Sequence, residues 1–165
     1  MSPVVRSDEV APTPWANGGG TTRELLRADD GSWRISLADV TTDGPFSAFP
    51  GRHRLLTVVD GPVLALQVDG EAHVVEPRRP FAFSGDAVVA ASVPEGPVRA
   101  LNVVVDPQVV DPHVTVLELG RSSALPLAED QAAYVLAGPE SGFLVTGPGE
   151  LSGRCTVAVI TLQRR

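Results

Sequence analysis

Arginine is the residue type in this chain that offers the clearest chemistry. All thirteen basic residues are arginine, since the sequence contains no lysine. The segment Trp33–Val40 alternates, with apolar side chains at Trp33, Ile35 and Leu37 and polar or small ones at Arg34, Ser36 and Ala38. Successive side chains of a β-strand point to opposite faces, so this pattern predicts a strand that buries one face and lines a polar pocket with the other. The alternative is a surface strand with a solvated arginine, because antiparallel sheets often face water on one side.

A second candidate binding element is the turn at residues 17–20, which contains three successive glycines. Such a run allows backbone N–H groups to point at one spot and form an anion-binding nest. Asn17 could offer its amide to a carboxylate or amide ligand, with Arg23 or Arg34 as the counter-charge. The alternative is a turn that only joins Trp15 to the next strand.

Asn102 is a further candidate because of its place in the segment Val98–Val105. Arg99 and Asn102 fall on opposite faces of that segment, so only one of them can share a pocket with Arg34. We favour Asn102, because a buried amide needs hydrogen-bond partners that a ligand or water could supply. The predicted ligand-binding residues are therefore Asn17, Arg23, Arg34, Ser36 and Asn102.

Arg34 is predicted to be the charge that holds the ligand. A guanidinium makes a planar, directional contact with a carboxylate, so we expect Arg34 to bind a small dicarboxylate or a formylated amino acid. Glu24 is expected to pair with an arginine, and Phe46 and Phe49 are expected to be core anchors rather than stacking platforms. An enzyme would need a carboxylate beside Arg34, whereas Asp39 falls on the apolar face of its strand.

The sequence offers little for metal or nucleophile chemistry. The three histidines, His53, His73 and His113, are isolated from one another, whereas a mononuclear metal site needs two or three imidazoles and a carboxylate at one point. Cys155 lies in an apolar segment, where a buried inert thiol is expected. We assign no catalytic residue and expect neither a metal nor any other cofactor.

Length and charge narrow the class of protein. At 165 residues the chain forms one domain, or two small lobes that share a core. A net charge of -7 without a basic run makes nucleic acid a poor partner, and no apolar run approaches the length of a membrane span. The N-terminal residues lack the pattern of a signal peptide, and a single cysteine fits a reducing compartment. We therefore expect a cytoplasmic protein that does not bind membranes.

The secondary structure is predicted to be all-β. Prolines and glycines interrupt the chain at short intervals, and the segments between them are rich in residues that favour strands. The predicted strands of the first part are Thr22–Arg27, Trp33–Val40, Arg54–Asp60, Val63–Val68, Ala72–Glu76, Phe81–Phe83, Ala87–Val93 and Val98–Val105. Those of the second part are Val114–Leu119, Ala133–Ala137, Gly142–Thr146 and Thr156–Gln163. Asp69-Gly70 is a strong hairpin signal, and Pro126 predicts a loop at Leu125–Ala133.

Many short strands at this spacing predict a β-barrel or a double-sheet sandwich. We place an N-terminal barrel in residues 1–105 and a shorter β lobe in residues 106–165. The second run of strands is too short to bury a core alone. It is therefore expected to pack on the first run within a single compact unit.

The chain resembles the HutD/Ves family in five segments that occur in the same order. They are PWANGGGTTREL, WRISLADV, DGPFSAFPGRHR, FxFxGD at Phe81–Asp86 and GPVRALNV at Gly96–Val103. Membership implies a cupin-type β-barrel, with two cupin lobes in one chain (a bicupin), in an intracellular bacterial protein. The family is associated in many bacteria with histidine utilisation, where regulation through a small acidic ligand has been suggested, and elsewhere with stress responses. No established enzymatic activity comes with it.

Together these features predict a metal-free cupin-like protein that binds a small carboxylate or amide metabolite, with regulation of histidine utilisation as the implied role. The alternative is a cupin enzyme, such as an isomerase, lyase or hydrolase, that uses acid/base chemistry on a small acid. A structural or protein-interaction module is the third class. The expected partner is a small acidic metabolite, and whether two copies form a homodimer stays open.

Overall fold

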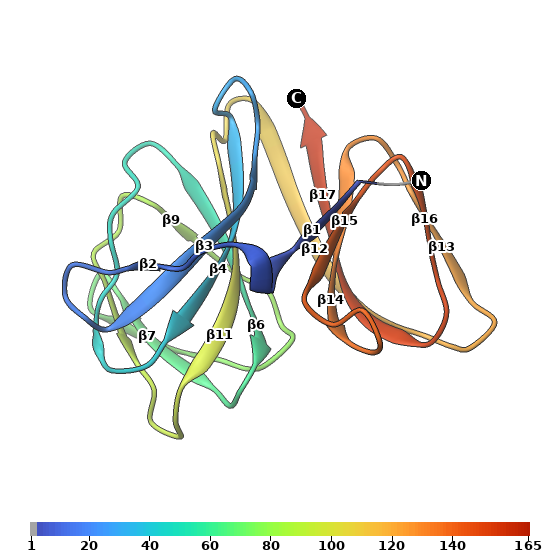
Figure 1. Ribbon diagram of the computed structural model, residues 1–165. Coiled ribbons are helices and arrows are strands. Elements are labelled where there is room, and N and C mark those ends of the chain that lie inside the picture. The colour runs from blue at the N-terminus through green and yellow to red at the C-terminus, as the bar shows by residue number, and fades with distance from the viewer. Residues whose placement is uncertain (1–2) are drawn as a thin grey trace.

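The computed structural model describes residues 3–165, which form almost entirely antiparallel β-structure (Figure 1). Within these residues the one helical element is a 3-10 helix at Ser7–Glu9. None of the described residues belongs to a helix with the length and apolar character that a bilayer crossing needs. The all-β prediction is confirmed.

A six-stranded sheet lies at the centre of the molecule, in the order β2-β3-β4-β11-β6-β9. Its strands are β2 (Thr13–Pro14), β3 (Gly20–Arg27), β4 (Trp33–Val40), β6 (His53–Asp60), β9 (Phe81–Ser84) and β11 (Val98–Val105). A four-stranded sheet in the order β5-β10-β7-β8 covers one of its faces. The strands of that sheet are β5 (Gly44–Pro45), β7 (Leu64–Val68), β8 (Glu71–Val75) and β10 (Val89–Ser92). These two sheets form the first sandwich.

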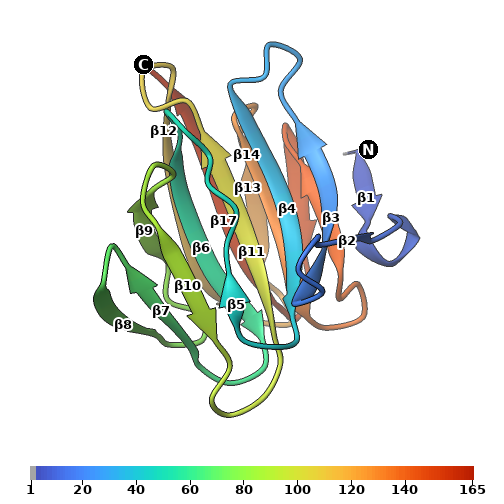
Figure 2. The same cartoon turned by 90° about the vertical axis from the view of Figure 1, so that its left-hand side faces the viewer.

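The second sandwich pairs a five-stranded sheet, β1-β15-β14-β17-β12, with a two-stranded sheet, β13-β16. The five strands are β1 (Val4–Arg6), β12 (Val110–Leu119), β14 (Gln131–Ala137), β15 (Phe143–Thr146) and β17 (Cys155–Arg164). The two-stranded sheet consists of β13 (Ala124–Leu127) and β16 (Gly149–Ser152). Figure 1 shows the two sandwiches side by side, and Figure 2 views them from the side of the first. The N-terminal strand β1 belongs to the second sandwich, although β2 belongs to the first.

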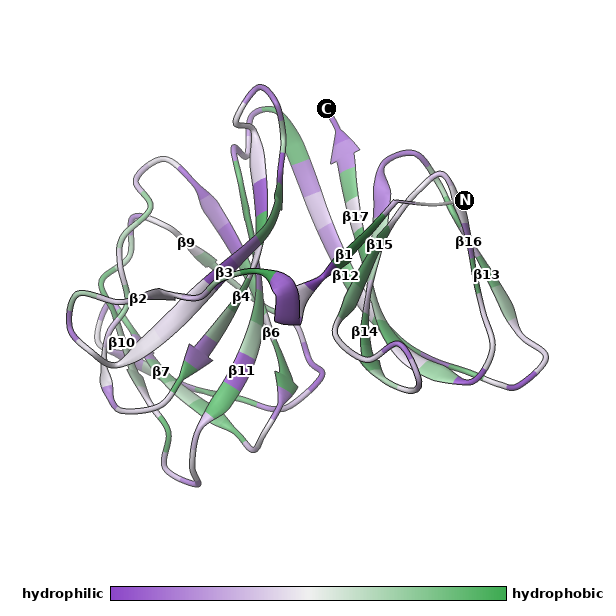
Figure 3. Cartoon of the chain, viewed as in Figure 1, coloured by the Kyte–Doolittle hydropathy of each residue, from purple (hydrophilic) through white to green (hydrophobic). Residues whose placement is uncertain are grey.

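Three apolar clusters lie between successive sheets of this stack. One fills the first sandwich and includes Leu56 and Leu66. A second joins the six-stranded sheet to the five-stranded sheet and includes Leu101 and Ile160, and a third fills the second sandwich. Figure 3 shows hydrophobic residues along β6 and β14, two strands inside the stack. The second sandwich therefore packs on the first, and it also encloses a core of its own, although its strands were predicted to be too short to bury one alone.

Strand β4 is buried on both faces, and its two alternating sets of side chains face different sandwiches. Ile35 and Leu37 have no exposed surface and face the second sandwich. Ser36 and Ala38 are only 4% and 5% exposed on the opposite face, within the first sandwich. The prediction that β4 buries an apolar face is confirmed, and the surface-strand alternative is excluded.

The predicted hairpin at Asp69-Gly70 joins β7 to β8. Both residues have positive φ, 50° and 83°, as the favoured two-residue turn requires. Strands β4 and β11 have the predicted bounds, and the other predicted strands differ mainly at their ends. The sheets form stacked sandwiches rather than one closed barrel.

The prediction of a loop around Pro126 is wrong, because Ala124–Leu127 forms strand β13. This strand pairs only with β16, with Pro126 opposite Glu150. Proline lacks an N–H donor, but it is tolerated in a strand whose other edge needs no hydrogen bonds. A proline therefore excludes a central strand more strongly than an edge strand.

Candidate functional site

A cavity of about 770 Å³ lies in the first sandwich, within the range of small-molecule sites. Its floor is the face of the six-stranded sheet that carries Ser36, and its walls come from residues 13–17 and 45–49. The polar lining includes Asn17, Glu24, Arg27, Arg34, Ser36, Arg54 and Asn102, and the aromatic lining comprises Trp15, Phe46 and Phe49.

Strand register explains why side chains from distant parts of the chain meet here. Asn102 of β11 pairs directly with Ser36 of β4. Two residues further along β11, Val104 pairs with Arg34 on one side and with Arg54 on the other. Directly opposite residues of paired strands place their side chains on the same face. The cavity floor therefore carries two arginines on either side of a valine, with an amide and a hydroxyl in the next row.

Arg54 is the most deeply placed charge of the cavity, with 6% of its surface exposed. Its guanidinium carbon lies 4.7 Å from the ring centroid of Phe83, 4.8 Å from that of Phe49 and 5.6 Å from that of Phe46. One N–H donates to the backbone oxygen of Ser47 at 3.1 Å. The buried Nε has no hydrogen-bond partner, and no carboxylate among residues 3–165 forms an ion pair with this guanidinium. Cation–π contacts therefore replace the usual counter-ion.

Burial and the neighbouring charge both disfavour the protonated form of Arg54. Desolvation is the larger cause and the charge of Arg34 the smaller, and together they lower the pKa of Arg54 to about 10. The guanidinium therefore still carries its positive charge at neutral pH. An anion entering the cavity would meet a cation whose charge is poorly screened.

Arg34 lies on the other side of Val104 from Arg54 and contacts the same aromatic ring. Its guanidinium carbon is 4.8 Å from the ring centroid of Phe49. Its nearest carboxylate oxygen belongs to Glu24, 3.8 Å from the Arg34 Nε, which is beyond hydrogen-bond distance. The Arg34 side chain is about one third exposed at 34%, so a ligand can reach it. Phe46 packs against the core of the first sandwich, as predicted, and both Phe46 and Phe49 also contact cavity arginines.

The remaining predicted floor residues, Ser36 and Asn102, are buried in the cavity, at 4% and 7% exposure. The Oδ1 atom of Asn102 has no hydrogen-bond partner. A buried amide oxygen without a partner loses its hydration without compensation. A ligand or water in the cavity, or an amide turned by half a revolution, would supply the missing contact.

Asn17 lines the cavity, but its side chain holds the wall together. Its amide nitrogen donates to the backbone oxygen of Pro45 at 3.1 Å, and its Oδ1 accepts the N–H of Gly19 at 2.8 Å. The adjacent Trp15 donates its indole N–H to the hydroxyl of Thr22 at 2.7 Å. These bonds fix the segment 13–17 against the sheet edge and against the start of the second wall.

The glycine turn closes on itself rather than forming a nest for anions. The N–H of Gly18 donates to the backbone oxygen of Trp15 at 3.0 Å, and that of Gly19 donates to Asn17. Gly20 is required for a different reason, because a Cβ there would collide with the backbone oxygen of Asp39 and crowd the ring of Trp15. The turn therefore shapes the cavity wall and brings Trp15 close to the sheet.

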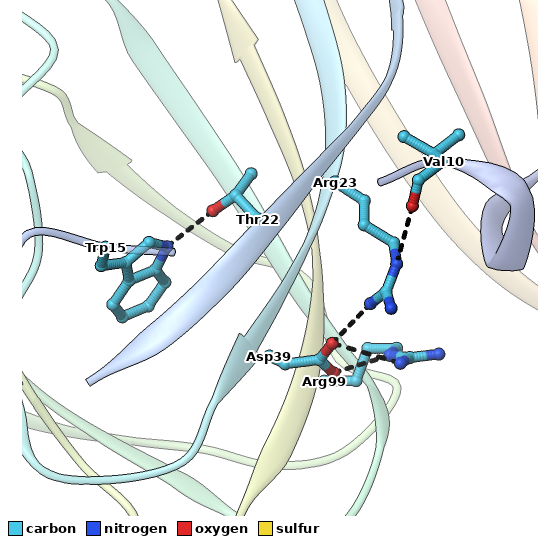
Figure 4. A network of polar contacts seen from close by, with 6 residues as sticks. All are labelled: Val10, Trp15, Thr22, Arg23, Asp39 and Arg99. Atoms are coloured by element: carbon cyan, nitrogen blue, oxygen red, sulfur yellow. Dashed lines mark hydrogen bonds and ion pairs between the residues drawn. The ribbon is translucent and has the colours of Figure 1, made fainter. Parts of the chain in front are cut away.

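Arg23 does not line the cavity, although we predicted it as a ligand residue. It lies on the opposite face of the six-stranded sheet, where its guanidinium donates to Asp39 at 2.8 Å and to the backbone oxygen of Val10 at 3.1 Å. Arg99 donates to both oxygens of the same carboxylate, at 2.8 and 3.2 Å. Figure 4 shows this network, with the Trp15–Thr22 contact on the other side of β3. We therefore leave Arg23 out of the proposed ligand contacts.

The histidines are dispersed, and within residues 3–165 no group of three or more His, Cys, Asp or Glu side chains has a geometry that could hold a metal ion. His73 lies beside the ring of Phe81, at 4.9 Å between centroids. His113 faces Asp111 at 3.2 Å on the surface of the second sandwich. Cys155 is half-buried, and burial raises the pKa of its thiol.

Two stacked antiparallel sandwiches, with a cationic cavity in the first, match the predicted cupin-like fold class. The chain belongs to the HutD family, whose family model, described as HutD, matches residues 7–149. The predicted membership of the HutD/Ves family is thereby confirmed.

Curated relatives match part of the chain. An uncharacterized 21.2 kDa protein in the hutC 3' region of Pseudomonas putida is 37% identical over 111 residues, which cover 64% of this chain and 58% of the relative. Protein Ves of Escherichia fergusonii is 39% identical over 87 residues, which cover 50% of this chain and 46% of the relative. The chain thus spans about half the length of these relatives.

Solved structures match over the whole chain. A conserved protein of unknown function from Pseudomonas aeruginosa PAO1 superposes with a TM-score of 0.86 at 25% identity, covering 100% of both chains. HutD from Pseudomonas fluorescens SBW25 superposes with a TM-score of 0.76 at 31% identity, covering 99% of this chain and 100% of the other. The arrangement of two sandwiches is therefore shared with these proteins.

Proposed function

We propose that the protein binds a small metabolite carrying a carboxylate or amide group in the cavity of the first sandwich, with Arg54 as its main anchor. The observation that carries this proposal is a guanidinium that is 6% exposed, lines a cavity and has no ion-paired carboxylate among the described residues. A buried charge without a partner costs free energy that an anionic ligand recovers. Three aromatic contacts hold the charge in place until the ligand arrives.

Three other floor residues extend the proposed contact set. Arg34 offers a second guanidinium whose N–H groups make no hydrogen bond within residues 3–165, and Asn102 offers an amide with an unpartnered oxygen. Ser36 lies between them in the register and adds a hydroxyl. A carboxylate on Arg54 and a polar group on the amide would satisfy these groups of the floor together.

The lining suits binding better than acid/base catalysis. No histidine or cysteine lines the cavity, and its one carboxylate, Glu24, already lies against Arg27 and Arg34 at 3.6 and 3.8 Å. A general acid or base must reach the reacting proton without such competition. We therefore propose a binding protein whose output is sensing or flux control.

The biological role that we propose is ligand-dependent regulation of histidine utilisation. Membership of the HutD family supports it, as does the printed name of the Pseudomonas putida relative, which places that protein in a hutC 3' region. Deleting the gene should change the expression of histidine-utilisation genes when histidine is the nitrogen source. A strain that carries Arg54→Met should behave like the deletion strain, whereas wild-type expression in that strain would contradict a role for the cavity.

Isothermal titration calorimetry against a panel of small carboxylates and their amides tests the binding proposal. We expect Arg54→Met, Arg34→Ala and Arg34→Lys each to weaken binding by roughly 1.5–3 kcal/mol, the value of a charge-assisted hydrogen-bonded contact. Lysine should fail because it cannot form the planar two-bond contact. Arg121→Met is the matched control, since Arg121 is exposed and outside the cavity.

Two outcomes would overturn the proposal. If no panel member binds, or if Arg54→Met binds with wild-type affinity, the cavity is not the ligand site. NMR spectra of the ligand recorded during the titration add a direct check for turnover. Consumption of the ligand by the wild type would instead support the alternative function, a cupin enzyme.

A further inference from the structure

Glu24 is the one carboxylate of the cavity lining, and it lies at the mouth with two arginines beside it. Its Oε1 atom is 3.8 Å from the Nε of Arg34 and 3.6 Å from the Nε of Arg27. Both distances exceed those of hydrogen bonds, so Glu24 attracts these guanidiniums without occupying their donors. The Glu24 side chain is 41% exposed and the Arg27 side chain is 67% exposed, so the carboxylate has room to turn outward.

The charges of the lining do not balance. Three arginines, Arg27, Arg34 and Arg54, face one carboxylate. Arg27 is largely in solvent, where its charge is screened, so the uncompensated charge belongs to Arg34 and Arg54. These two guanidinium carbons lie 4.8 Å from the same Phe49 ring centroid. They are therefore no more than twice that distance apart, within reach of one small molecule.

Few donors of these two arginines are in use. One N–H of Arg54 donates to the backbone of Ser47, and Arg34 makes no hydrogen bond within residues 3–165. A single carboxylate at Arg54 would leave Arg34 facing only the distant oxygen of Glu24. A second acidic group on the same ligand would match both cations of the floor.

We propose that the ligand carries two acidic groups, that the first binds Arg54, and that the second binds Arg34 by displacing Glu24, which turns to Arg27. This inference rests on the proposed function, since it names the ligand class of the same cavity. Glu24 is then an internal competitor that occupies the place of the second acidic group in the empty cavity. Its repulsion weakens ligands that fail to engage Arg34, so it selects diacids over monoacids.

Calorimetry with matched ligand pairs tests this inference. Succinate and glutarate are compared with their half-amides, succinamate and glutaramate, which keep the chain length and remove one charge. We expect each diacid to bind the wild type at least about tenfold more tightly than its half-amide, because a contact between two ions is roughly twice as strong as a neutral one. Arg34→Gln should bring the two affinities together.

Glu24→Gln is the decisive variant, because it removes the competitor while keeping the shape of the side chain. We expect it to tighten diacid binding by about three- to tenfold, as a like charge leaves the site. Arg121→Gln, which removes one positive charge outside the cavity, should leave the preference unchanged. Thermal melts of all variants check that they are folded, and the exposure of Glu24 makes a folding defect unexpected.

Several results would overturn the inference. Equal affinity of the wild type for a diacid and its half-amide would show that a second acidic group is not needed. The proposed binding function would still stand. Weaker diacid binding by Glu24→Gln would show that Glu24 assists rather than competes. If inorganic phosphate bound as tightly as the diacids, the site would recognise one compact dianion and not two separate acidic groups. If neither diacids nor monoacids nor amides bind, the proposed function fails as well.

Discussion

Each face of the six-stranded sheet carries a pair of arginines, but in the described part of the chain only one of the two pairs is hydrogen-bonded to a carboxylate. On the face toward the second sandwich, Arg23 and Arg99 converge on Asp39 through hydrogen bonds of 2.8 to 3.2 Å. On the cavity face, Arg34 and Arg54 have no hydrogen-bonded carboxylate within residues 3–165. One sheet thus holds a pair of arginines that share a hydrogen-bonded carboxylate and a pair that has none among the described residues.

The pKa shifts of Arg99 and Arg54 have opposite signs, and they follow the presence and the absence of a hydrogen-bonded carboxylate. Hydrogen bonding to Asp39 is the main reason that the pKa of Arg99 is raised, whereas desolvation is the main reason that the pKa of Arg54 is lowered. A guanidinium that is hydrogen-bonded to a carboxylate contributes to the stability of the fold. A guanidinium without a carboxylate partner keeps N–H donors available for a ligand. The presence of Asp39, and not the arginines themselves, therefore distinguishes the pair that stabilises the fold from the pair that we propose to bind the ligand.

Replacing Asp39 by alanine should give the largest effect on stability. It leaves two partly buried guanidiniums without a counter-ion, and we expect the free energy of unfolding to fall by roughly 2–4 kcal/mol. Urea denaturation monitored by tryptophan fluorescence measures the change. Glu24→Ala removes the same charge on the cavity face, where the contacts are longer, and should cost less than about 1 kcal/mol. Equal losses for the two variants would erase the contrast between the faces.

Replacing Arg54 by methionine should separate stability from binding. Methionine keeps contacts with the three phenylalanines and removes a buried charge, so the free energy of unfolding should change by less than about 1 kcal/mol in either direction. Binding of a small acid should nevertheless weaken by roughly 1.5–3 kcal/mol. Arg99→Met should show the reverse pattern, with reduced stability and retained binding. A loss above roughly 2 kcal/mol for Arg54→Met would mean that this arginine is structural.

Two buried polar atoms without partners allow a smaller and closely matched test. The Oδ1 of Asn102 faces the cavity side, and the Oγ1 of Thr57 faces the second sandwich, opposite Leu101. Asn102→Leu and Thr57→Val should each raise the free energy of unfolding by about 1 kcal/mol, because each removes an unpaired polar group. Ligand calorimetry should then show weaker binding for Asn102→Leu alone. Weaker binding in both variants would indicate an indirect effect through the sheet.

Changes in pH near neutrality should have little effect on ligand affinity. The lowered pKa of Arg54, about 10, means that its charged form is present below that pH and is lost as the pH rises through it. Affinity for an acid should therefore stay constant between about pH 6 and pH 9 and decline above about pH 10. The stability penalty of burying the charge follows the same curve and is relieved at high pH. A decline in affinity between about pH 6 and pH 8 would instead point to a histidine.

The sequence predicted the strands of the cavity floor well because their alternation is strong. Trp33–Val40 and Val98–Val105 have the predicted bounds, and Arg34, Ser36 and Asn102 share the cavity. Alternation within one strand fixes which residues share a face, and a buried apolar face then orients the strand. Those three positions followed from local pattern alone.

The remaining site residues depended on contacts that local pattern does not encode. Arg23 and Arg34 are both arginines beside polar neighbours, and only the pairing of β3 with β4 shows that they lie on opposite faces. Arg54 was not selected, because its burial results from residues 45–49 folding across it. The one available signal was an arginine at the start of the largely apolar segment 54–59, since a charged residue is rarely buried in such a strand unless it is paired.

The most direct measurement follows the arginine Nε–H groups by two-dimensional NMR during a titration with succinate or glutarate, with signals assigned from single arginine variants. The Nε of Arg54 is buried, so its proton should exchange slowly enough to observe. We expect the signals of Arg54 and Arg34 to shift together and saturate at one ligand concentration, while those of Arg23 and Arg99 stay in place. Shifts confined to Arg23 and Arg99, or no shift at Arg54, would contradict the assignment of the cavity pair to ligand binding.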